Sequence, residues 1–520
     1  MLVHINSAKC IGIDAVRVTV EVNIVLGIGI HLVGLADIAV RESLLRTITA
    51  LGALGYHIPG RKIVINLAPA DLHKQGSGYD LPIAVGIIAA SEQENFPQLQ
   101  DFLIMGELGL DGSVRYIPGA LPIADFASGL GIRNCILPLS AALEAVEFKN
   151  LNIYGVKDLA EVVKILSGKE DCSDLLVWNT QEYRMLKRSE QHRKPGRVAD
   201  GVMDFADIVG QEEAKRGAEI AAAGGHNLIM IGPPGAGKSS LAKAMSGIMP
   251  PMTRDEAIVT SKIYSIAGIG PKGVGLVSQR PFRTPHYSTS LAAIIGGGAG
   301  DNIAPGEVTL STNGILFLDE FGQMPKSVVE ALRGPLEDRK VTISRLRAKV
   351  EYPASFMLVA ASNPCPCGYY GEGERCTCTP SQRRNYLARL SGPILDRIDL
   401  HVRLRPVESG RMIENRKAES SAVVAERVLK ARIAQKLRFA TESINCNAEM
   451  DKQLIEKYCP LSDACRDALE KILTSMKLSM RAFLRIIRVA RTIADIEGSD
   501  EILVRHISEA ASFRFLDRQD

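Results

Sequence analysis

The stretch that decides the fold is Asn227-Leu-Ile-Met-Ile-Gly-Pro-Pro-Gly-Ala-Gly-Lys-Ser239. Its first part, Leu228 to Ile231, is a short apolar run, which is typical of a central strand in a parallel sheet. The glycines that follow let the backbone turn tightly before a helix begins near Lys238. All fixed positions of the pattern G-x-x-x-x-G-K-[ST] are filled, between a strand and a helix. We therefore predict a phosphate-binding loop and not a glycine-rich turn without a ligand.

This loop predicts a role for its side chains. We expect Lys238 to reach the β- and γ-phosphates of ATP, and the Ser239 hydroxyl to ligate Mg²⁺. The positive N-terminal end of the following helix favours the phosphates. The residues expected to bind the nucleotide are Gly232, Pro233, Pro234, Gly235, Ala236, Gly237, Lys238, Ser239, Ser240 and Asp319.

A second strong pattern is Gly314-Ile-Leu-Phe-Leu-Asp-Glu320, in which two carboxylates follow four apolar residues. The spacing predicts a buried strand with Asp319 and Glu320 at its carboxyl end. We expect Asp319 to hold Mg²⁺ and Glu320 to orient and deprotonate the attacking water. A strand that simply ends in exposed acids is common, but the phosphate loop upstream argues against it.

The composition places the chain among globular proteins and sets its scale. Its 520 residues predict about three domains. It is 46% hydrophobic and 23% charged, and its formal net charge of +3 leaves any basic surface to be local. We find no apolar run of membrane-spanning length and no signal-peptide pattern, so we expect a cytoplasmic protein without membrane contact. Its 10 cysteines are then expected to be reduced or metal-bound.

Four parts follow one another along the chain. Residues 1–168 predict an α/β domain, 169–204 a linker, 205–404 the nucleotide-binding core, and 405–520 a helical lid. In the first domain we expect strands at Ala15–Val25, Lys62–Leu67, Cys135–Leu137 and Leu151–Tyr154, and helices at Ile38–Leu54 and Asp80–Ser91. The linker is basic between Arg184 and Arg197, which is consistent with DNA contact or with a solvated helix.

The first domain resembles the Lon-protease-like domain of magnesium-chelatase-type ATPases, a fold related to domain 2 of ribosomal protein S5. The resemblance rests on Asn66-Leu-Ala-Pro-Ala70, His73-Lys-Gln-Gly-Ser77, Asp80-Leu-Pro-Ile-Ala84 and Gly106-Glu-Leu-Gly-Leu110. Lon proteases use a Ser–Lys dyad. Here Gly78, next to Ser77, falls at the serine position, and Ile123 or one of its neighbours falls at the lysine position, with no lysine between Leu103 and Phe148. A serine without a base is inert, so we expect a scaffold domain without protease chemistry.

Several residues of the core and lid resemble those of AAA+ ATPases. Asp207–Gln211 precedes the first core strand and is expected near the adenine. Asn363, at the end of the apolar run Phe356–Ser362, resembles sensor 1. Arg397 matches the arginine finger that acts on a neighbouring subunit, and Arg481 resembles sensor 2. The resemblance therefore implies catalytic roles for all three and assembly into a ring.

Arg397 also has a structural interpretation, an ion pair with Asp396 or Asp399. The ion pair and the finger role are compatible, at different stages of the cycle. The segment Lys477–Asp495 has the pattern of an amphipathic helix, and Ala418–Phe439 is the longest helical pattern of the lid. In the first of these segments we expect Arg485, Arg488 and Arg491 to form a solvated or interfacial face.

Taken together, the chain resembles the magnesium-chelatase-like AAA+ family that includes bacterial competence proteins of the ComM and YifB type. The most specific stretches are Arg280-Pro-Phe-Arg-Thr-Pro-His286, Ile294-Ile-Gly-Gly-Gly298, Pro305-Gly-Glu-Val-Thr-Leu-Ser311 and Asn363-Pro-Cys-Pro-Cys-Gly368. Tyr287 stands where a second histidine is expected. The resemblance implies a homo-hexameric ATPase that moves along single-stranded or branched DNA, as a helicase or branch-migration motor in natural transformation or recombination, with recombination proteins as possible partners. An ATPase that remodels a protein partner is the alternative.

Two pairs of cysteines, Cys365-Pro-Cys367 and Cys376-Thr-Cys378, flank an eight-residue glycine-containing loop. Four thiolates in two close pairs can surround one tetrahedral Zn²⁺, and with all four ligands supplied by the protein the site would be structural. C-x-C pairs also occur in redox switches, but reduced cytosolic thiols favour a metal. We therefore predict a zinc site.

Between the Asp319–Glu320 strand and Asn363, the segment from Arg339 to Val350 predicts a β-hairpin with its tip at Ser344–Ala348. In the helicase branch of AAA+ proteins this position corresponds to a hairpin that points into the ring pore. Arg345, Arg347 and Lys349 would there contact DNA phosphates, in a sequence-independent and salt-sensitive manner. The alternative is a solvated turn, because no aromatic residues alternate with these charges to stack on bases.

Overall fold

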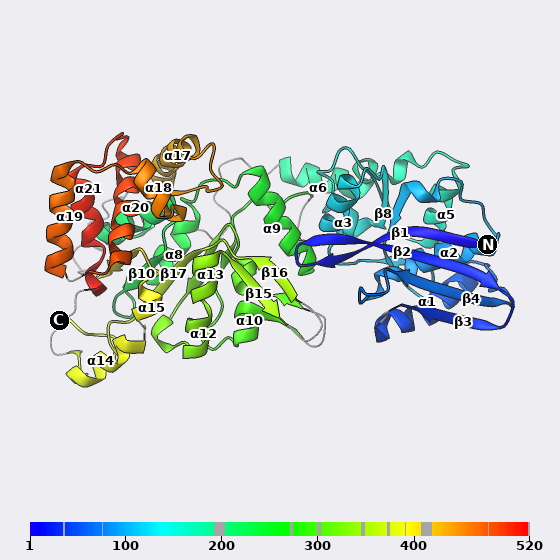
Figure 1. Ribbon diagram of the computed structural model, residues 1–520, viewed down its shortest axis with the longest axis horizontal. Coiled ribbons are helices and arrows are strands. Elements are labelled where there is room, and N and C mark those ends of the chain that lie inside the picture. The colour runs from blue at the N-terminus through cyan, green and yellow to red at the C-terminus, as the bar shows by residue number, and fades with distance from the viewer. Residues whose placement is uncertain are drawn as a thin grey trace.

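The computed structural model describes residues 1–34, 37–74, 76–191, 203–270, 274–298, 303–344, 349–371, 375–389, 392–406, 419–476 and 478–517. Figure 1 shows an elongated molecule with an N-terminal α/β domain at one end, an α/β core in the middle and the lid helices at the other end. The predicted fold class, mixed α/β with a parallel sheet in the core and a helical C-terminal region, is confirmed.

A seven-stranded sheet in the order β3-β4-β2-β1-β5-β8-β9 forms the N-terminal domain. The long antiparallel pair β1–β2 is in register from Leu2–Asn23 to Ile11–Asp14. The strands are β1 (Leu2–Ile11), β2 (Asp14–Val25), β3 (Gly29–Val33), β4 (Lys62–Ala68), β5 (Phe102–Ile104), β8 (Asn134–Pro138) and β9 (Asn152–Val156), with a small ladder of β6 (Glu107–Leu108) and β7 (Val114–Arg115).

The helices of this domain are α1 (Ile38–Ala53), α2 (Asp80–Ala90), α3 (Ala120–Gly129), α4 (Leu139–Ala142), α5 (Leu159–Ser167) and α6 (Gln181–Gln191). Helix α2 is almost wholly buried and lies close to the sheet. A Cβ at Gly86 would lie 2.5 Å from Cγ2 of Val22, so only glycine permits this approach. The predicted strands and helices of the domain are confirmed, with ends that differ by one or two residues, whereas β1, β3, β5 and the helices α3, α4 and α5 are among the elements that were not predicted.

Part of the predicted linker packs on this domain. Val177 is fully buried, and Trp178 and Tyr183 pack against the N-terminal core. The basic positions Arg193, Lys194 and Arg197 lie outside the described residues.

A five-stranded parallel sheet in the order β11-β14-β17-β10-β18 forms the core. Its strands are β10 (Leu228–Ile231), β11 (Phe282–Arg283), β14 (Ile315–Leu318), β17 (Met357–Ser362) and β18 (Leu400–Arg403). Strands β10, β14 and β17 are buried at every position, as expected for a parallel sheet covered on both faces. Strand order differs from chain order, and β10 lies between β17 and β18. In such sheets, ligands bind in the crevice outside the carboxyl ends of the strands.

The core helices are α7 (Glu212–Gly224), α8 (Lys238–Ser246), α9 (Arg254–Ile266), α10 (Leu291–Ile295), α11 (Glu307–Leu310), α12 (Lys326–Ala331), α13 (Arg333–Asp338), α14 (Pro380–Arg389) and α15 (Gly392–Leu395). Two small antiparallel ladders accompany them, β12 (Gly296–Gly297) with β13 (Ala304–Pro305), and β15 (Lys340–Ser344) with β16 (Lys349–Pro353). The last pair is the predicted hairpin.

The lid consists of α17 (Ser421–Arg438), α18 (Lys452–Tyr458), α19 (Asp463–Met476), α20 (Met480–Glu497) and α21 (Val504–Ser512). Helix α20 is amphipathic as predicted and buries Ile486, Ile487 and Ala490 against the core. One prediction was wrong. Arg491 was expected on a solvated or interfacial face, but it is 3% exposed. The protein tolerates this burial because the guanidinium donates hydrogen bonds to the Asp495 carboxylate and to the carbonyls of Ser499 and Asp500.

Helix α9 of the core docks on α3 of the N-terminal domain. The amide of Gly119 donates to the carbonyl of Ser265 at 2.9 Å. Lys262 forms ion pairs with Asp14 at 3.0 Å and Asp125 at 2.7 Å. The β1–β2 turn lies against the hairpin, where a Cβ at Gly12 would be 2.9 Å from the carbonyl oxygen of Glu351. The two halves are therefore joined through specific polar contacts.

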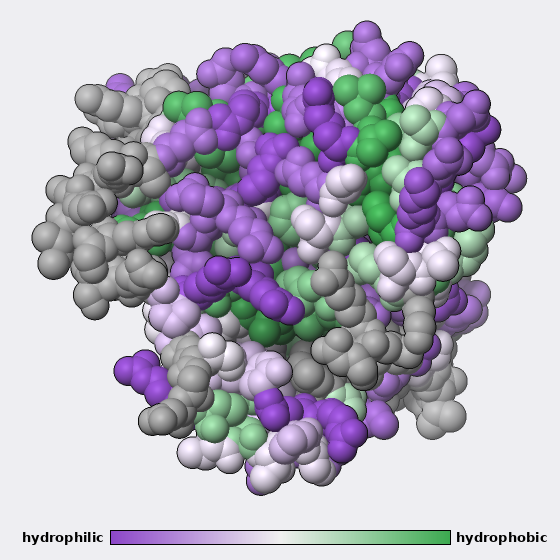
Figure 2. All heavy atoms as spheres, turned by 90° about the vertical axis from the view of Figure 1, so that its left-hand side faces the viewer, coloured by the Kyte–Doolittle hydropathy of each residue, from purple (hydrophilic) through white to green (hydrophobic). Residues whose placement is uncertain are grey.

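Figure 2 looks onto the end of the molecule that carries the lid, where hydrophilic residues cover much of the surface and hydrophobic ones form smaller patches between them. None of the helices in the described part of the chain combines the length and the apolar character that crossing a membrane requires.

Candidate nucleotide site

The phosphate loop lies at the carboxyl end of β10 and leads into α8. Gly235 and Gly237 have φ angles of 79° and 89°, in the left-handed region that favours glycine. Gly232 allows a close approach, since a Cβ there would lie 2.7 Å from the carbonyl oxygen of Leu404. The loop is therefore bent as the sequence predicted and is held against the chain that follows β18.

Lys238 lies inside this loop. Its ammonium donates hydrogen bonds to the carbonyl oxygens of Gly232 at 2.6 Å and Pro233 at 2.9 Å, and to Oδ1 of Asn363 at 3.1 Å. Burial lowers the pKa of Lys238, while the charges of Asp319 and Glu320 oppose that shift. A phosphate oxygen would give this cation a charged partner and hence a stronger hydrogen bond than a carbonyl does.

Ser239 and Asp319 meet beside the loop. The Ser239 hydroxyl donates to Oδ2 of Asp319 at 2.7 Å, and the amide of Glu320 donates to Oδ1 of the same carboxylate at 2.9 Å. A hydroxyl and a carboxylate placed side by side are oxygen ligands that suit Mg²⁺. These two residues fit the predicted magnesium site.

Glu320, two residues after β14, has an unusual backbone conformation. Its φ and ψ are 50° and 38°, in the left-handed region, and a short helical turn η6 (Phe321–Gln323) follows. This conformation is uncommon for a residue with a side chain, and such strain is often found at functional sites. The turn leaves Glu320 half-buried next to Asp319, whose carboxylate accepts the Glu320 amide.

On the other side of the loop, Gln211 connects three segments. Its Nε2 donates to the carbonyl of Ala236 at 3.3 Å and to that of Arg405 at 2.6 Å, and its Oε1 accepts from the amide of Arg405 at 3.2 Å. Gln211 therefore ties the segment Asp207–Gln211 to the phosphate loop, and its expected place near the adenine stays a prediction.

Arg397 and Arg481 line a different cavity, of about 330 Å³. None of its described lining residues belongs to the phosphate loop, whereas Asn227, at the amino end of β10, does line it. Strand β10 has four residues and spans about 13 Å. The two arginines therefore lie near its amino end, and the phosphate loop follows its carboxyl end. They are brought together with each other and not with Lys238.

Arg397 has a partner that was not predicted. Arg397 pairs with Glu337 of α13 at 2.5 Å, which lowers the pKa of the Glu337 carboxyl. Asp399 is instead bound by Arg485 at 3.2 Å, which gives Arg485 an interfacial position between lid and core. The sequence carried no signal for Glu337, because it belongs to a separate helix with no fixed spacing to Arg397.

The four predicted cysteines form one cluster, with all four Sγ atoms within 4.8 Å of one another. The Sγ of Cys365 lies 3.3 Å from that of Cys367 and 3.9 Å from that of Cys376. Tetrahedral zinc with bonds of about 2.3 Å separates its sulfur ligands by about 3.8 Å. The backbone N–H of Tyr369 helps to lower the pKa of Cys367 to about 6. This donor set could bind zinc.

Of the predicted DNA-binding residues, Arg345 and Arg347 lie outside the described residues. Lys349 begins β16, opposite Ser344, and is exposed. It also lines a cavity of about 1270 Å³ between the N-terminal domain and the core.

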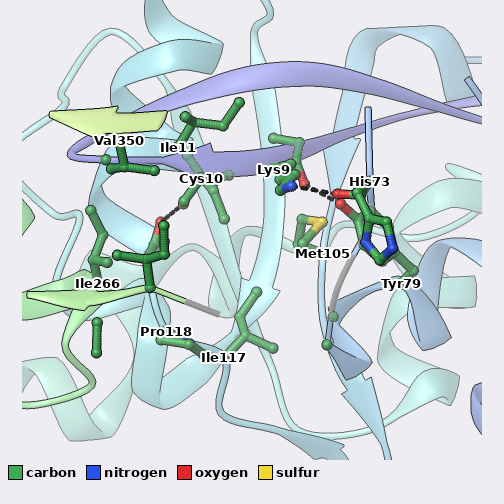
Figure 3. A pocket seen from close by; sticks show the side chains of 18 of the residues that line it. Lys9, Cys10, Ile11, His73, Tyr79, Met105, Ile117, Pro118, Ile266 and Val350 are labelled. Atoms are coloured by element: carbon green, nitrogen blue, oxygen red, sulfur yellow. Dashed lines mark hydrogen bonds between the residues drawn. The ribbon is translucent and has the colours of Figure 1, made fainter. Parts of the chain in front are cut away.

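Figure 3 shows this interdomain cavity, in which Lys9 donates a hydrogen bond to the carbonyl of His73 and the Cys10 thiol to that of Gly119. Ser77, Gly78 and Ile123 line it too. The Ser77 hydroxyl donates to the carboxylate of Glu107. The serine next to the position expected for a nucleophile is therefore bound by a carboxylate and not by a lysine.

Comparison with known proteins gave three family matches. Residues 204–412 match "Magnesium chelatase, subunit ChlI", residues 20–141 match "Subunit ChlI of Mg-chelatase", and residues 418–514 match "Magnesium chelatase, subunit ChlI C-terminal". The chain is 42% identical to the uncharacterized protein YifB of Salmonella typhimurium, over 99% of this chain and 97% of that protein. It is 40% identical to the competence protein ComM of Haemophilus influenzae, over 99% and 98%.

A more distant similarity covers part of the chain. It is 26% identical to the DNA replication licensing factor Mcm6 of Drosophila melanogaster, over 60% of this chain and 37% of that protein.

Proposed function

The chain belongs to the magnesium-chelatase-like family of AAA+ ATPases, of the ComM and YifB type, and from this premise we propose that it couples ATP hydrolysis to movement along DNA. The observation that carries the ATPase part is that the carboxyl ends of the neighbouring strands β14, β17 and β10 bring their functional residues together. There Lys238 binds Asn363, and Ser239 binds Asp319. Three separate stretches of sequence thus supply one site.

Each residue has a distinct task in the proposed hydrolysis. Glu320 orients the attacking water and accepts its proton. Lys238 holds the β- and γ-phosphates, and Asn363, bound to Lys238, lies where it can orient the γ-phosphate. Mg²⁺, held by Ser239 and Asp319, would neutralise part of the phosphate charge when bound. Burial lowers the pKa of Lys238 because it removes water from the ammonium. A bound anionic substrate would offset this cost, since a nearby negative charge favours the charged form.

A ring is part of the proposal, because Arg397 and Arg481 line a cavity that none of the described phosphate-loop residues shares. This cavity lies at the opposite, amino ends of the core strands. In a closed ring of identical subunits, one edge of each core faces the opposite edge of the next. We therefore infer that Arg397 and Arg481 act on the nucleotide of the neighbouring subunit, in a homo-hexamer. An exposed stripe of Leu429, Ile433 and Leu437 on α17 supplies further surface for such a contact.

DNA is the partner that we propose. The name of the competence relative and the similarity to a replication licensing factor support it. So does the chemistry of the hairpin, with Arg345, Arg347 and Lys349 close together in sequence. Helicase or branch-migration activity in natural transformation or recombination, alongside recombination proteins, is the specific form of the proposal.

The experiment that tests this function is an ATPase assay with and without single-stranded, duplex and branched DNA, at several salt concentrations. We expect DNA to stimulate hydrolysis and the stimulation to weaken as salt rises. An ATPase that no form of DNA stimulates, and that binds none at low salt, would favour the alternative, a motor that remodels a protein partner.

We also propose that Cys365, Cys367, Cys376 and Cys378 hold one structural zinc ion. The Sγ separations and the all-sulfur donor set support this site. For the N-terminal domain, residues 1–168, we propose a scaffold role without protease chemistry, supported by the Ser77–Glu107 contact and by Ile123 at the expected lysine position.

A further inference from the structure

The cysteine cluster lies directly behind the nucleotide site. Asn363, whose Oδ1 accepts the hydrogen bond from Lys238, is followed two residues later by Cys365, which is fully buried. Gly368 closes the turn after the first cysteine pair with a φ of 88°. A Cβ at Gly368 would lie 2.8 Å from Cδ of Pro234 in the phosphate loop and 3.8 Å from Cγ of Asn363. This turn therefore touches both the loop and the sensor asparagine.

The second cysteine pair leads to another part of the same site. Cys376 and Cys378 precede α14, whose Tyr386 hydroxyl lies 3.2 Å from the Ser362 hydroxyl, one residue before Asn363. A Cβ at Gly322 would lie 2.8 Å from that Tyr386 oxygen, so α14 also packs on the turn that follows Glu320. A second link crosses the insertion, because the Arg383 guanidinium lies 4.4 Å from the centre of the Tyr370 ring.

We propose that a divalent metal held by the four thiolates clamps this insertion onto the phosphate loop and so sets the affinity for ATP. The inference rests on the proposed ATPase and adds a positioning role to the cluster. The metal joins two segments, one reaching Asn363 and Pro234 and the other reaching Ser362 and Gly322. Without it, the four thiols add little to the Arg383–Tyr370 contact in holding those segments together, since each thiol is only a weak hydrogen-bond donor. A soft d¹⁰ ion such as Zn²⁺ suits four sulfur ligands.

The direct test uses the full chain, kept reduced throughout. Zinc content is measured first, and we expect about one ion per chain. The metal is then removed with a zinc-selective chelator in excess Mg²⁺, and ATP affinity is measured before removal, after it and after Zn²⁺ is returned. We expect affinity to fall by roughly tenfold or more on removal and to recover on reloading, because small displacements of positioning groups have effects of this size.

A pair of glycine variants separates the clamp from general folding. Gly368→Ala places a methyl group against Pro234, whereas Gly371→Ala, with a φ of 94°, meets nothing within 4 Å. Both introduce the same kind of backbone strain in the same loop. We expect both to keep zinc, and only Gly368→Ala to weaken ATP binding as metal removal does. This pair decides the question even if the metal-free chain unfolds.

A second comparison asks whether the metal acts through Asn363. In an Asn363→Ala background, metal removal should cause a much smaller further loss of ATP affinity, because coupled groups give non-additive effects. Equal ATP affinity with and without metal, together with equal affinity of the two glycine variants, would overturn the proposal. So would purified chain with no metal and four freely titrating thiols. A chain that holds zinc but neither binds nor hydrolyses ATP would instead refute the proposed function.

Discussion

At the scale of single residues, the nucleotide site combines charges that would be costly apart. Lys238 is 9% exposed, and its ammonium is satisfied by two carbonyls and Asn363. Asp319 and Glu320 lie close enough to raise the pKa of Lys238 against the effect of burial. A buried cation with neutral acceptors and nearby carboxylates is therefore prepared for a phosphate with its magnesium ion.

This arrangement predicts different defects for two substitutions. Lys238→Ala should abolish nucleotide binding or turnover, because the only ammonium within the loop is removed. Glu320→Gln should keep ATP bound but slow hydrolysis by roughly 10²-fold or more, because the water loses its base. Binding of a fluorescent ATP analogue and phosphate release measure the two steps. Lys243→Ala, on the exposed side of α8, is the matched control and should behave like the parent. Parental hydrolysis by Glu320→Gln would show that the base is another residue.

Residues with fixed spacing could be predicted from the sequence, and residues without it could not. Lys238, Ser239 and Asp319 lie in short patterns that determine both their elements and their contacts. Glu337 has no such pattern, and its pairing with Arg397 depends on how α13 packs. Arg491 was expected to be solvated or interfacial because charged residues usually are. Its side chain is buried because Asp495 and two carbonyls satisfy it.

At the scale of elements, the hairpin β15–β16 connects the core to the N-terminal domain. Its pairs run from Lys340–Pro353 at the base to Ser344–Lys349 near the tip, and Val341, Ile343 and Val350 are buried on one face. The β1–β2 turn packs there, with Ile13 against the same apolar cluster. The hairpin is thus anchored through this buried face. Alternating hydrophobicity predicted its two strands, but the contact with Gly12 joins distant parts of the chain and could not be predicted.

The hairpin carries the prediction about DNA. Replacing Arg345, Arg347 and Lys349 by Ala should weaken DNA binding and reduce its salt dependence, because fewer counterions are released. The slope of log affinity against log salt should fall by roughly 0.7–0.9 for each DNA phosphate that the variant no longer neutralises. Basal hydrolysis should remain, while DNA stimulation decreases. Titrations at several salt concentrations measure the slope, with Lys340→Ala at the hairpin base as the control. Unchanged affinity and slope would move the DNA site elsewhere, with the basic segment 184–197 next to be tested.

At the scale of the whole molecule, the contact between the N-terminal domain and the core includes a buried carboxylate. Glu144 of the N-terminal domain accepts hydrogen bonds from Ser265 of α9 at 2.5 Å and from Tyr116 at 3.0 Å. Burial raises the pKa of Glu144 above its ordinary value of 4.5, although both hydroxyl contacts oppose that shift. In the folded protein, Glu144 therefore keeps its proton to a higher pH than it does in the unfolded chain.

This raised pKa predicts how stability changes with pH. Between 4.5 and the raised pKa the folded chain binds more protons at Glu144 than the unfolded chain, so this residue's contribution to stability falls as pH rises through that window. Glu144→Gln imitates the protonated acid and should flatten this part of the profile. Thermal unfolding from about pH 5 to about pH 8 measures the difference from the parent chain, with Glu147→Gln as the neighbouring control. If Glu144→Gln and the parent show parallel profiles, the interface does not respond to this carboxyl group.

The proposed ring leads to a prediction about nucleotide sites that two neighbouring subunits complete. Arg397, 7% exposed at its side chain and paired with Glu337, lies across the sheet from Lys238. Arg397→Ala should leave ATP binding intact yet slow hydrolysis by roughly 10³-fold or more, since a finger stabilises charge that develops in the transition state. Arg397→Ala subunits mixed with Glu320→Gln subunits should recover activity at interfaces that join an intact finger to an intact base. Phosphate release as a function of mixing ratio measures this recovery. Mixed rings, verified by a size tag on one variant, that stay as slow as either variant alone would mean that Arg397 serves the nucleotide of its own chain or none at all.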